Sequence, residues 1–188
     1  MLVDDAVTAF IDRVKAILAS SGPTAHGLEL IAEQMRDLVR NPSLAESQDE
    51  PAGNVHTGHH SKPLYTDETG LTLVRARFGP ETMTPIHNHG SWGIVGVYRG
   101  EDRYQIWRRL DDGATPGRAK IEFVEEMILG PGDVVIMPNP PQDVHAQQGY
   151  GGQAAFELVL FGKNTMALPR LYFDAETGAT REVGPGQR

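Results

Sequence analysis

The most informative stretch of this 188-residue chain is PIHNHG, at residues 85–90. Two histidines, His87 and His89, stand two positions apart in it, beside proline and glycine residues that mark the ends of a predicted strand. Because side chains alternate between the two faces of a strand, both imidazoles point to the same side. Two imidazoles on one face at this spacing are typical of a metal site, for which they would supply about half of the ligands.

A third histidine, His145, lies 56 residues after His89 and follows two clusters of turn residues, GPGD at 130–133 and PNPP at 138–141. That separation suits a chain that runs up and down a small barrel and returns to the same mouth. Three neutral imidazoles with open coordination positions suit iron, zinc, copper or nickel better than calcium or magnesium. We predict that His87, His89 and His145 bind such a metal; the alternative is that they are core histidines with satisfied hydrogen bonds.

The composition indicates one globular domain, residues 1–188, with a single core. The chain has no cysteine, which excludes disulfides, thiolate ligands and a cysteine nucleophile. Its apolar stretches are too short to span a membrane, and the N-terminal residues MLVDD do not resemble a secretory signal. We therefore predict a protein of a bacterial-type cytoplasm with no membrane partner.

The charge pattern argues against nucleic acid as a partner. The formal net charge is -8, and the arginines between residues 75 and 109 are interleaved with aspartate and glutamate. Phosphate binding needs a concentrated basic face, whereas mixed charge is typical of the outer faces of strands. We expect a small-molecule substrate, and an exposed barrel edge would allow a homodimer.

The periodicity predicts two helices followed by a β-domain. Apolar residues recur every three or four positions over residues 4–19 and again over about 23–40, where Pro42 ends the second helix. The polar stretch 41–61 predicts a long loop. Beyond it, short apolar or alternating runs separated by turn residues predict an antiparallel sandwich or barrel over residues 62–175. These runs are 71–78, 93–98, 104–109, 121–129, 133–137, 155–161 and 171–173.

Two segments resemble the motifs of the cupin superfamily. The pattern Gly79-x7-His87-x-His89, with Gly100 further on, is similar to the first cupin motif. The pattern Gly132-x5-Pro138, followed by His145, is similar to the second. This resemblance implies a mainly β fold, the double-stranded β-helix (cupin) barrel, preceded here by the two N-terminal helices of residues 1–40.

The chain lacks the glutamate that cupins usually carry four or five residues after the second histidine, because Gly93 and Ile94 stand there. A three-histidine site without that carboxylate resembles the cysteine dioxygenase family of thiol dioxygenases. The stretch TPIHNHGSWG, at 84–93, is similar to bacterial members, and the leading helices extend the similarity over nearly the whole chain. The resemblance implies ferrous iron on the three histidines, with substrate thiolate and dioxygen as the partners and a sulfinate as product.

The resemblance also suggests substrate-binding residues. The family's residue for the substrate carboxylate aligns best with Lys62, and His60 falls where many relatives carry tyrosine. A solvated loop lysine is the alternative for Lys62. Trp92 directly follows the metal motif and is expected at the pocket rim, unless it is ordinary barrel core. Gly93 falls where some animal enzymes have a cysteine crosslinked to tyrosine.

One departure from the thiol dioxygenase pattern leaves more than one reaction open. The family places a histidine and a tyrosine two residues apart on a late strand, but here Val159 and Phe161 take those places, and neither exchanges protons. Glu157 shares their face and is conceivable as a fourth ligand, although we expect a solvated or salt-bridged carboxylate. The alternatives to a thiol dioxygenase are a metal-dependent cupin with other chemistry, such as carbon–carbon cleavage or isomerisation, and a non-enzymatic cupin that binds a small molecule or senses metal.

Overall fold

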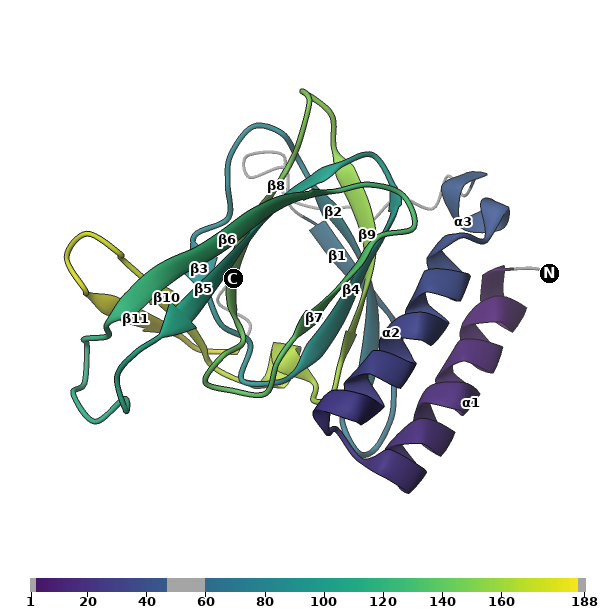
Figure 1. The fold of residues 1–188 in the computed structure, drawn as a ribbon, viewed down its shortest axis with the longest axis horizontal. Coiled ribbons are helices and arrows are strands. Elements are labelled where there is room, and N and C mark those ends of the chain that lie inside the picture. The colour runs from purple at the N-terminus through teal and green to yellow at the C-terminus, as the bar shows by residue number, and fades with distance from the viewer. Residues whose placement is uncertain (1–2, 47–59, 186–188) are drawn as a thin grey trace.

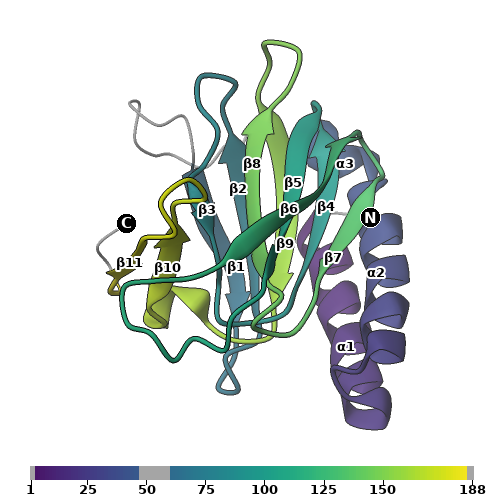
Figure 2. The same cartoon turned by 60° about the vertical axis from the view of Figure 1, so that its left-hand side comes forward.

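The computed structural model describes residues 3–46 and 60–185, which form a helical layer against two β-sheets (Figures 1 and 2). The elements in chain order are α1 (Val3–Ser21), α2 (Ala25–Val39), α3 (Pro42–Glu46), β1 (His60–Thr66), β2 (Thr72–Phe78), β3 (Ile86–His87), β4 (Gly93–Arg99), β5 (Asp102–Arg109), β6 (Ile121–Leu129), β7 (Val134–Met137), β8 (Val144–Gly149), β9 (Ala155–Phe161), the 3-10 turn η1 (Thr165–Ala167), β10 (Arg170–Phe173) and β11 (Thr180–Val183).

The two sheets have the topology of a double-stranded β-helix. One contains β1-β2-β9-β4-β7 in spatial order, and the other contains β11-β10-β3-β8-β5-β6. Neighbouring strands pair antiparallel, and Figure 1 shows the two sheets facing one another across a common interior. The mainly β fold with two leading helices is therefore confirmed.

Side chains alternate along each strand of the five-stranded sheet, so one face of this sheet points to the barrel interior and the other points to the helices. In β9, Val159 and Phe161 face the interior, whereas Leu158 and Leu160 face the helices. The interior residues of both sheets form one apolar cluster, which consists of Val74, Ala76, Val95, Val97, Tyr104, Leu129, Met137, Val159 and Phe161. Both faces of this sheet are covered near its centre, so β9 is buried throughout and β4 nearly so.

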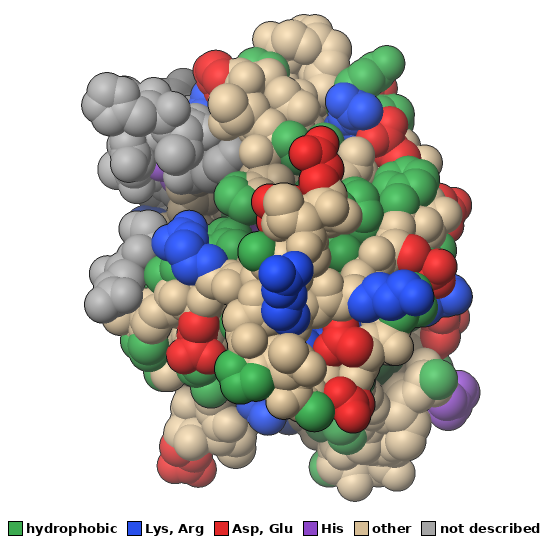
Figure 3. Space-filling model, turned by 90° about the vertical axis from the view of Figure 1, so that its left-hand side faces the viewer, with side chains coloured by type: hydrophobic (Ala, Val, Ile, Leu, Met, Phe, Trp, Pro, Cys, Tyr) green, Lys and Arg blue, Asp and Glu red, His purple; other side chains and the backbone are tan. Residues whose placement is uncertain are grey.

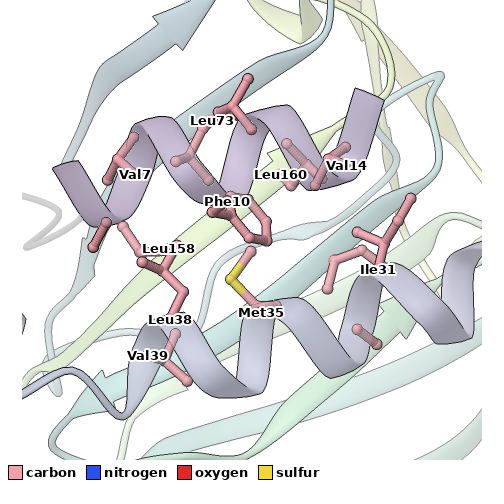
Figure 4. Close-up of a cluster of buried hydrophobic side chains, with 14 of the residues drawn as sticks. Val7, Phe10, Val14, Ile31, Met35, Leu38, Val39, Leu73, Leu158 and Leu160 are labelled. Carbon is pink, nitrogen blue, oxygen red and sulfur yellow. The ribbon is translucent and has the colours of Figure 1, made fainter. Parts of the chain in front are cut away.

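Helices α1 and α2 cover the outer face of the five-stranded sheet (Figures 2 and 4). Their inward stripes, including Phe10 and Met35, follow the helical repeat and pack on Leu73, Leu158 and Leu160 of the sheet. Gly96 permits this approach, because a Cβ there would lie 2.8 Å from the Met35 Cγ atom. The helices thus form the outer half of the core.

Shortening Met35 is expected to destabilise the helical layer. Met35 is 0% exposed, and its truncation to alanine leaves a cavity between α2 and the sheet. We expect Met35→Ala to lower the free energy of unfolding by about 2–5 kcal/mol in urea denaturation. Glu33→Ala, at an exposed position of the same helix, should change it by less than about 0.5 kcal/mol. Equal effects of the two changes would contradict this packing.

The structure alters the expected boundaries. The stretch 41–61 was predicted as loop, but it begins with the short helix α3 and ends in β1, while residues 47–59 lie outside the described part. Strands continue to Val183, past the predicted end of the barrel at residue 175. The strand β11 is mostly polar, so only its pairing with β10 reveals it.

Two surface properties bear on partners. Over residues 3–46 and 60–185, no helix is both long enough and apolar enough to cross a membrane. On the face shown in Figure 3, basic and acidic side chains are interspersed, so no broad basic surface forms there.

Candidate metal centre

Strand pairing brings the three predicted histidines together. In the register of β3 and β8, His87 stands opposite His145, and His89 follows two residues after His87. The three side chains are buried, with exposed fractions of 5%, 6% and 4% for His87, His89 and His145. One nitrogen from each ring lies within 4.8 Å of the others, and the Nε2 atoms of His89 and His145 are 2.8 Å apart. Three convergent imidazoles form a group that could bind a metal ion.

The hydrogen bond of His87 and the neutral state of His145 suit a transition metal. His87 Nδ1 lies 2.8 Å from the Pro85 carbonyl oxygen and donates to it, which leaves the Nε2 lone pair for a metal. Burial, followed by the charge of Arg170, lowers the pKa of His145 to about 3, so its ring is neutral. Metal–nitrogen bonds of about 2.0–2.1 Å place neighbouring ligand nitrogens about 3 Å apart, close to the His89–His145 separation.

Asp143 accepts hydrogen bonds from the backbone at His89 and the two residues that follow it. Its Oδ2 atom accepts hydrogen bonds from the backbone N–H groups of His89 (2.9 Å), Gly90 (2.6 Å) and Ser91 (3.4 Å). Its side chain is 0% exposed, so burial raises its pKa while these N–H groups oppose the rise. Because Asp143 lies two residues before His145, it fixes His89 relative to the third histidine.

Strand β10 contributes two residues that the sequence analysis did not identify. Arg170 Nη2 lies 3.1 Å from His89 Nδ1, and Tyr172 stands opposite His87 with the two ring centres 5.9 Å apart. Arg170 and Tyr172 are two residues apart, so they share the strand face that meets the histidines. They add a positive charge and a phenol to the site. The run 171–173 predicted a strand, but no sequence pattern indicated that it pairs with β3.

Of the two apolar residues that the sequence analysis singled out on β9, Phe161 contacts a histidine of the group. Phe161 packs on His89 with ring centres 4.7 Å apart, and Val159 belongs to the same apolar cluster of the interior. Gly93 is the register partner of Phe161, and a Cβ at Gly93 would lie 3.2 Å from the Phe161 ring. The chain therefore has an apolar ring next to a candidate metal ligand.

The predicted substrate contacts lie elsewhere. Trp92 is 7% exposed and belongs to the cluster between the sheet and the helices, on the face opposite to the barrel interior. His60 and Lys62 pair with Arg77 and Arg75 in the β1–β2 register, so they also lie on the outer face of the sheet. Burial and the charge of Arg77 lower the pKa of His60. The structure does not bring these three residues to the histidines.

The environment of Glu157 differs from the one expected from the sequence. It is 0% exposed and faces the barrel interior, where it accepts a hydrogen bond of 3.0 Å from Gln147 Nε2. The expectation of a solvated or salt-bridged carboxylate was wrong, because β9 is covered on both faces. Glu157 is also absent from the metal-binding group within the described residues.

No family model matches the chain. Among solved structures, it is similar to an oxalate oxidase at 23% identity and a TM-score of 0.48, covering 65% of this chain and 64% of that one. A cupin-like protein from Thermotoga maritima gives 24% identity and a TM-score of 0.48 over 70% and 91% of the two chains. KdgF from Halomonas sp. gives 16% identity and a TM-score of 0.44 over 62% and 92%.

The chain thus spans just under two thirds of the length of the oxalate oxidase chain. The fold follows from the strand pairing described above, and the candidate centre follows from the three convergent histidines. The protein has a double-stranded β-helix with a three-histidine group at which a metal ion could bind.

Proposed function

We propose that this protein is a metal-dependent dioxygenase of the cysteine dioxygenase type. It would add dioxygen to the sulfur of a small thiol carboxylate, so that RSH and O2 give the sulfinate RSO2⁻ and a proton. The observation that supports this proposal most directly is the composition of the metal group: within the described residues it contains His87, His89 and His145 and no carboxylate. Three neutral ligands leave coordination positions for both reactants.

Ferrous iron is the proposed metal, held by one nitrogen of each of His87, His89 and His145. When bound, it supplies adjacent positions for a thiolate and dioxygen and delocalises charge between them. Other divalent transition metals accept the same imidazole ligands, so the proposal includes a measurement of which metal the protein holds.

The surrounding residues suit a small anionic substrate. Arg170 places a guanidinium beside His89, and a guanidinium is the natural partner for a carboxylate. Phe161 and Val159 line the interior with apolar groups that exclude water from the reacting sulfur. Tyr172 adds a phenol near His87. Arg170 thus takes the substrate-carboxylate role for which the sequence suggested Lys62.

Removing the guanidinium is expected to weaken binding of substrates that carry a carboxylate. Loss of a charged hydrogen bond costs about 1.5–3 kcal/mol, which is roughly 10- to 100-fold in KM for Arg170→Gln. A thiol without a carboxylate, such as cysteamine, should lose much less. Arg108→Gln, in an exposed ion pair with Glu122, is the control, and iron content is measured in both. Equal loss for both kinds of thiol would assign Arg170 to the histidines instead of the substrate.

The test of the function combines metal content with oxygen uptake. The purified protein is analysed for metals, loaded anaerobically with ferrous iron, and supplied with cysteine or 3-mercaptopropionate. We expect one iron per chain, thiol-dependent oxygen uptake, and a sulfinate that contains both atoms of ¹⁸O2. Iron binding without uptake would contradict the dioxygenase proposal.

A second candidate is a metal-dependent cupin enzyme with other chemistry, such as carbon–carbon cleavage or isomerisation. Val159 and Phe161 favour it, because neither replaces the proton-exchanging pair of the thiol dioxygenases. Iron without thiol-dependent uptake would support it. A non-enzymatic cupin that binds a small molecule is the third candidate, and ligand binding without any metal would support that one.

A further inference from the structure

The last strand of the six-stranded sheet, β6, is long and exposed. It pairs with β5 on one side, and no strand of residues 3–46 and 60–185 pairs with its other side. Residues 122–126 and Ile128 of β6 are exposed. An edge strand presents backbone N–H and C=O groups that can pair with a further strand. The nine-residue edge of β6 is therefore a place at which another strand can add to the sheet.

The strand β6 also carries half of the large apolar side chains that are exposed. Six such side chains are exposed within the described residues, and three of them are Phe123 at 50%, Val124 at 40% and Ile128 at 41%. A fourth, Leu110, adjoins β6, because its backbone N–H donates to the Lys120 carbonyl oxygen at 2.8 Å. Exposed apolar groups that gather in one place mark an interaction surface.

The charges at this edge permit the approach of a second copy of the chain. The formal net charge of -8 makes two copies repel one another in general. On β6, however, Glu126 forms an ion pair with Arg103 at 2.8 Å, and Glu122 forms one with Arg108 at 3.1 Å. Among the glutamates of β6, Glu125 is the one without an ion pair in the described residues. The edge is therefore close to neutral in an acidic protein.

The sequence of β6 is self-complementary in one antiparallel register. A symmetric dimer has a two-fold axis, so two copies of β6 that meet edge to edge run antiparallel. When the axis lies between Val124 and Glu125, no glutamate of β6 stands opposite a glutamate. A shift by one residue in either direction places Glu125 opposite Glu125 or Glu122 opposite Glu126, and like charges directly opposite are destabilising. The opposed pairs of the favoured register are Val124–Glu125, Phe123–Glu126, Glu122–Met127 and Ile121–Ile128.

The bulge in β6 makes this register match the faces of the strand as well. The pairing of β5 with β6 shifts at Val124, which has no register partner on β5. Phe123 and Glu126 thereby stand opposite Trp107 and Gln105, which lie two residues apart and share one face. Side chains that stand directly opposite in an antiparallel pair lie on the same face. Phe123 and Glu126 meet this condition although they are three residues apart.

We propose that the protein forms a symmetric dimer in which β6 pairs antiparallel with β6 of a second copy, with Val124 opposite Glu125. The two six-stranded sheets then form one continuous sheet. In the register of this sheet, Glu125 stands opposite Ile106, and Ile106 stands opposite His145. The interface thus lies two strands, about 10 Å, from His145. The dimer does not depend on the reaction at the histidines.

Sedimentation equilibrium of the full chain tests the dimer. At micromolar concentrations we expect a species of twice the chain mass of 20.5 kDa. Val124→Glu places a carboxylate opposite Glu125 twice in each dimer and should raise the dissociation constant about tenfold. Val124→Lys places an ammonium there and should leave the constant unchanged or lower it. Met166→Glu and Met166→Lys make the same charge changes at an exposed position of η1, so these controls should affect the constant much less.

Amide hydrogen exchange locates the interface. Exchange of residues 121–129 should slow as the wild-type concentration rises through the dissociation constant, and Val124→Glu should weaken this protection. A wild type that stays monomeric at micromolar concentrations would overturn the dimer, and the glutamates of β6 would then serve to keep the edge from associating. A dimer that responds to neither change at Val124 would overturn the assignment to β6. Equal weakening by Val124→Glu and Val124→Lys would overturn the proposed register.

Discussion

Replacing His89 by alanine is expected to abolish stoichiometric metal binding. The change removes one of three ligands and leaves His87 and His145, whose ligand nitrogens cannot enclose an ion by themselves. Loss of a supporting residue behind a ligand reduces metal affinity by about 10- to 100-fold, and loss of a ligand itself should exceed this. Iron per chain after anaerobic loading, and calorimetric titration with the metal alone, measure the effect without reference to catalysis.

His26→Ala is the matched control, because His26 is exposed at the start of α2, far along the chain from the three histidines. It should bind as much iron as wild type. Circular dichroism should show both variants folded, since the core cluster of the interior does not include His89. If His89→Ala retained one iron per chain, the metal would be bound elsewhere, and the central assignment of this site would be wrong.

The second large expected effect is a fall in the free energy of unfolding as the pH rises. The pKa of Asp102 is raised from 3.8 to about 7 in the folded protein, so between these values the folded state binds more protons than the unfolded state. The stabilising contribution is fully present below about pH 4 and is lost as the pH rises through about 7. The raised pKa of Glu157 extends the loss of stability to higher pH.

The comparison of wild type with Asp102→Asn isolates this contribution. Asparagine resembles the protonated side chain and does not titrate, so the variant should become progressively more stable relative to wild type between pH 5 and pH 8. Urea unfolding at several pH values measures the difference. Glu125→Gln, which changes an exposed carboxylate, should leave the pH dependence unchanged. A constant difference between wild type and Asp102→Asn across this range would contradict a raised pKa at Asp102.

The local part of the site was predictable because it depends on strand geometry alone. The two-residue pitch of a strand places His87 and His89 on one face wherever the strand lies. The turn clusters around 130–141 indicated that the chain reverses before His145, and the structure places it opposite His87. The helices were equally predictable, because an apolar repeat of three and four residues has one interpretation in a short segment.

The residues around the histidines were not predictable in the same way. Arg170 reaches His89 because β10 pairs with β3, a contact between positions 81 residues apart. Asp143 reaches the backbone of His89 across 54 residues. The sequence shows each residue as an ordinary polar position in or near a strand. Register between distant strands depends on the packing of the whole barrel, which no local pattern reports.

Trp92 and Glu157 also show that the environment of a residue does not follow from its neighbours in the sequence. Each was assigned an environment from its neighbours in the sequence, Trp92 at a pocket rim and Glu157 at a solvated face. The helices, however, cover the outer face of the five-stranded sheet, and Trp92 packs in the apolar cluster between them. Glu157 lies on the inner face of this sheet, where the second sheet shields it from solvent. Which face of a strand is inner or outer is a tertiary property when both faces are buried.

The sequence by itself therefore determined the class of fold, the two helices and the three histidines, because these follow from short-range periodicity and from side-chain chemistry. The tertiary structure alone decided that Arg170 and Tyr172 meet the histidines and that His60 and Lys62 lie on the outer face. It also decided that the carboxyl groups of Asp102 and Glu157 are buried. These features depend on the pairing of strands that are remote in the chain, and only the closed pair of sheets brings such strands together.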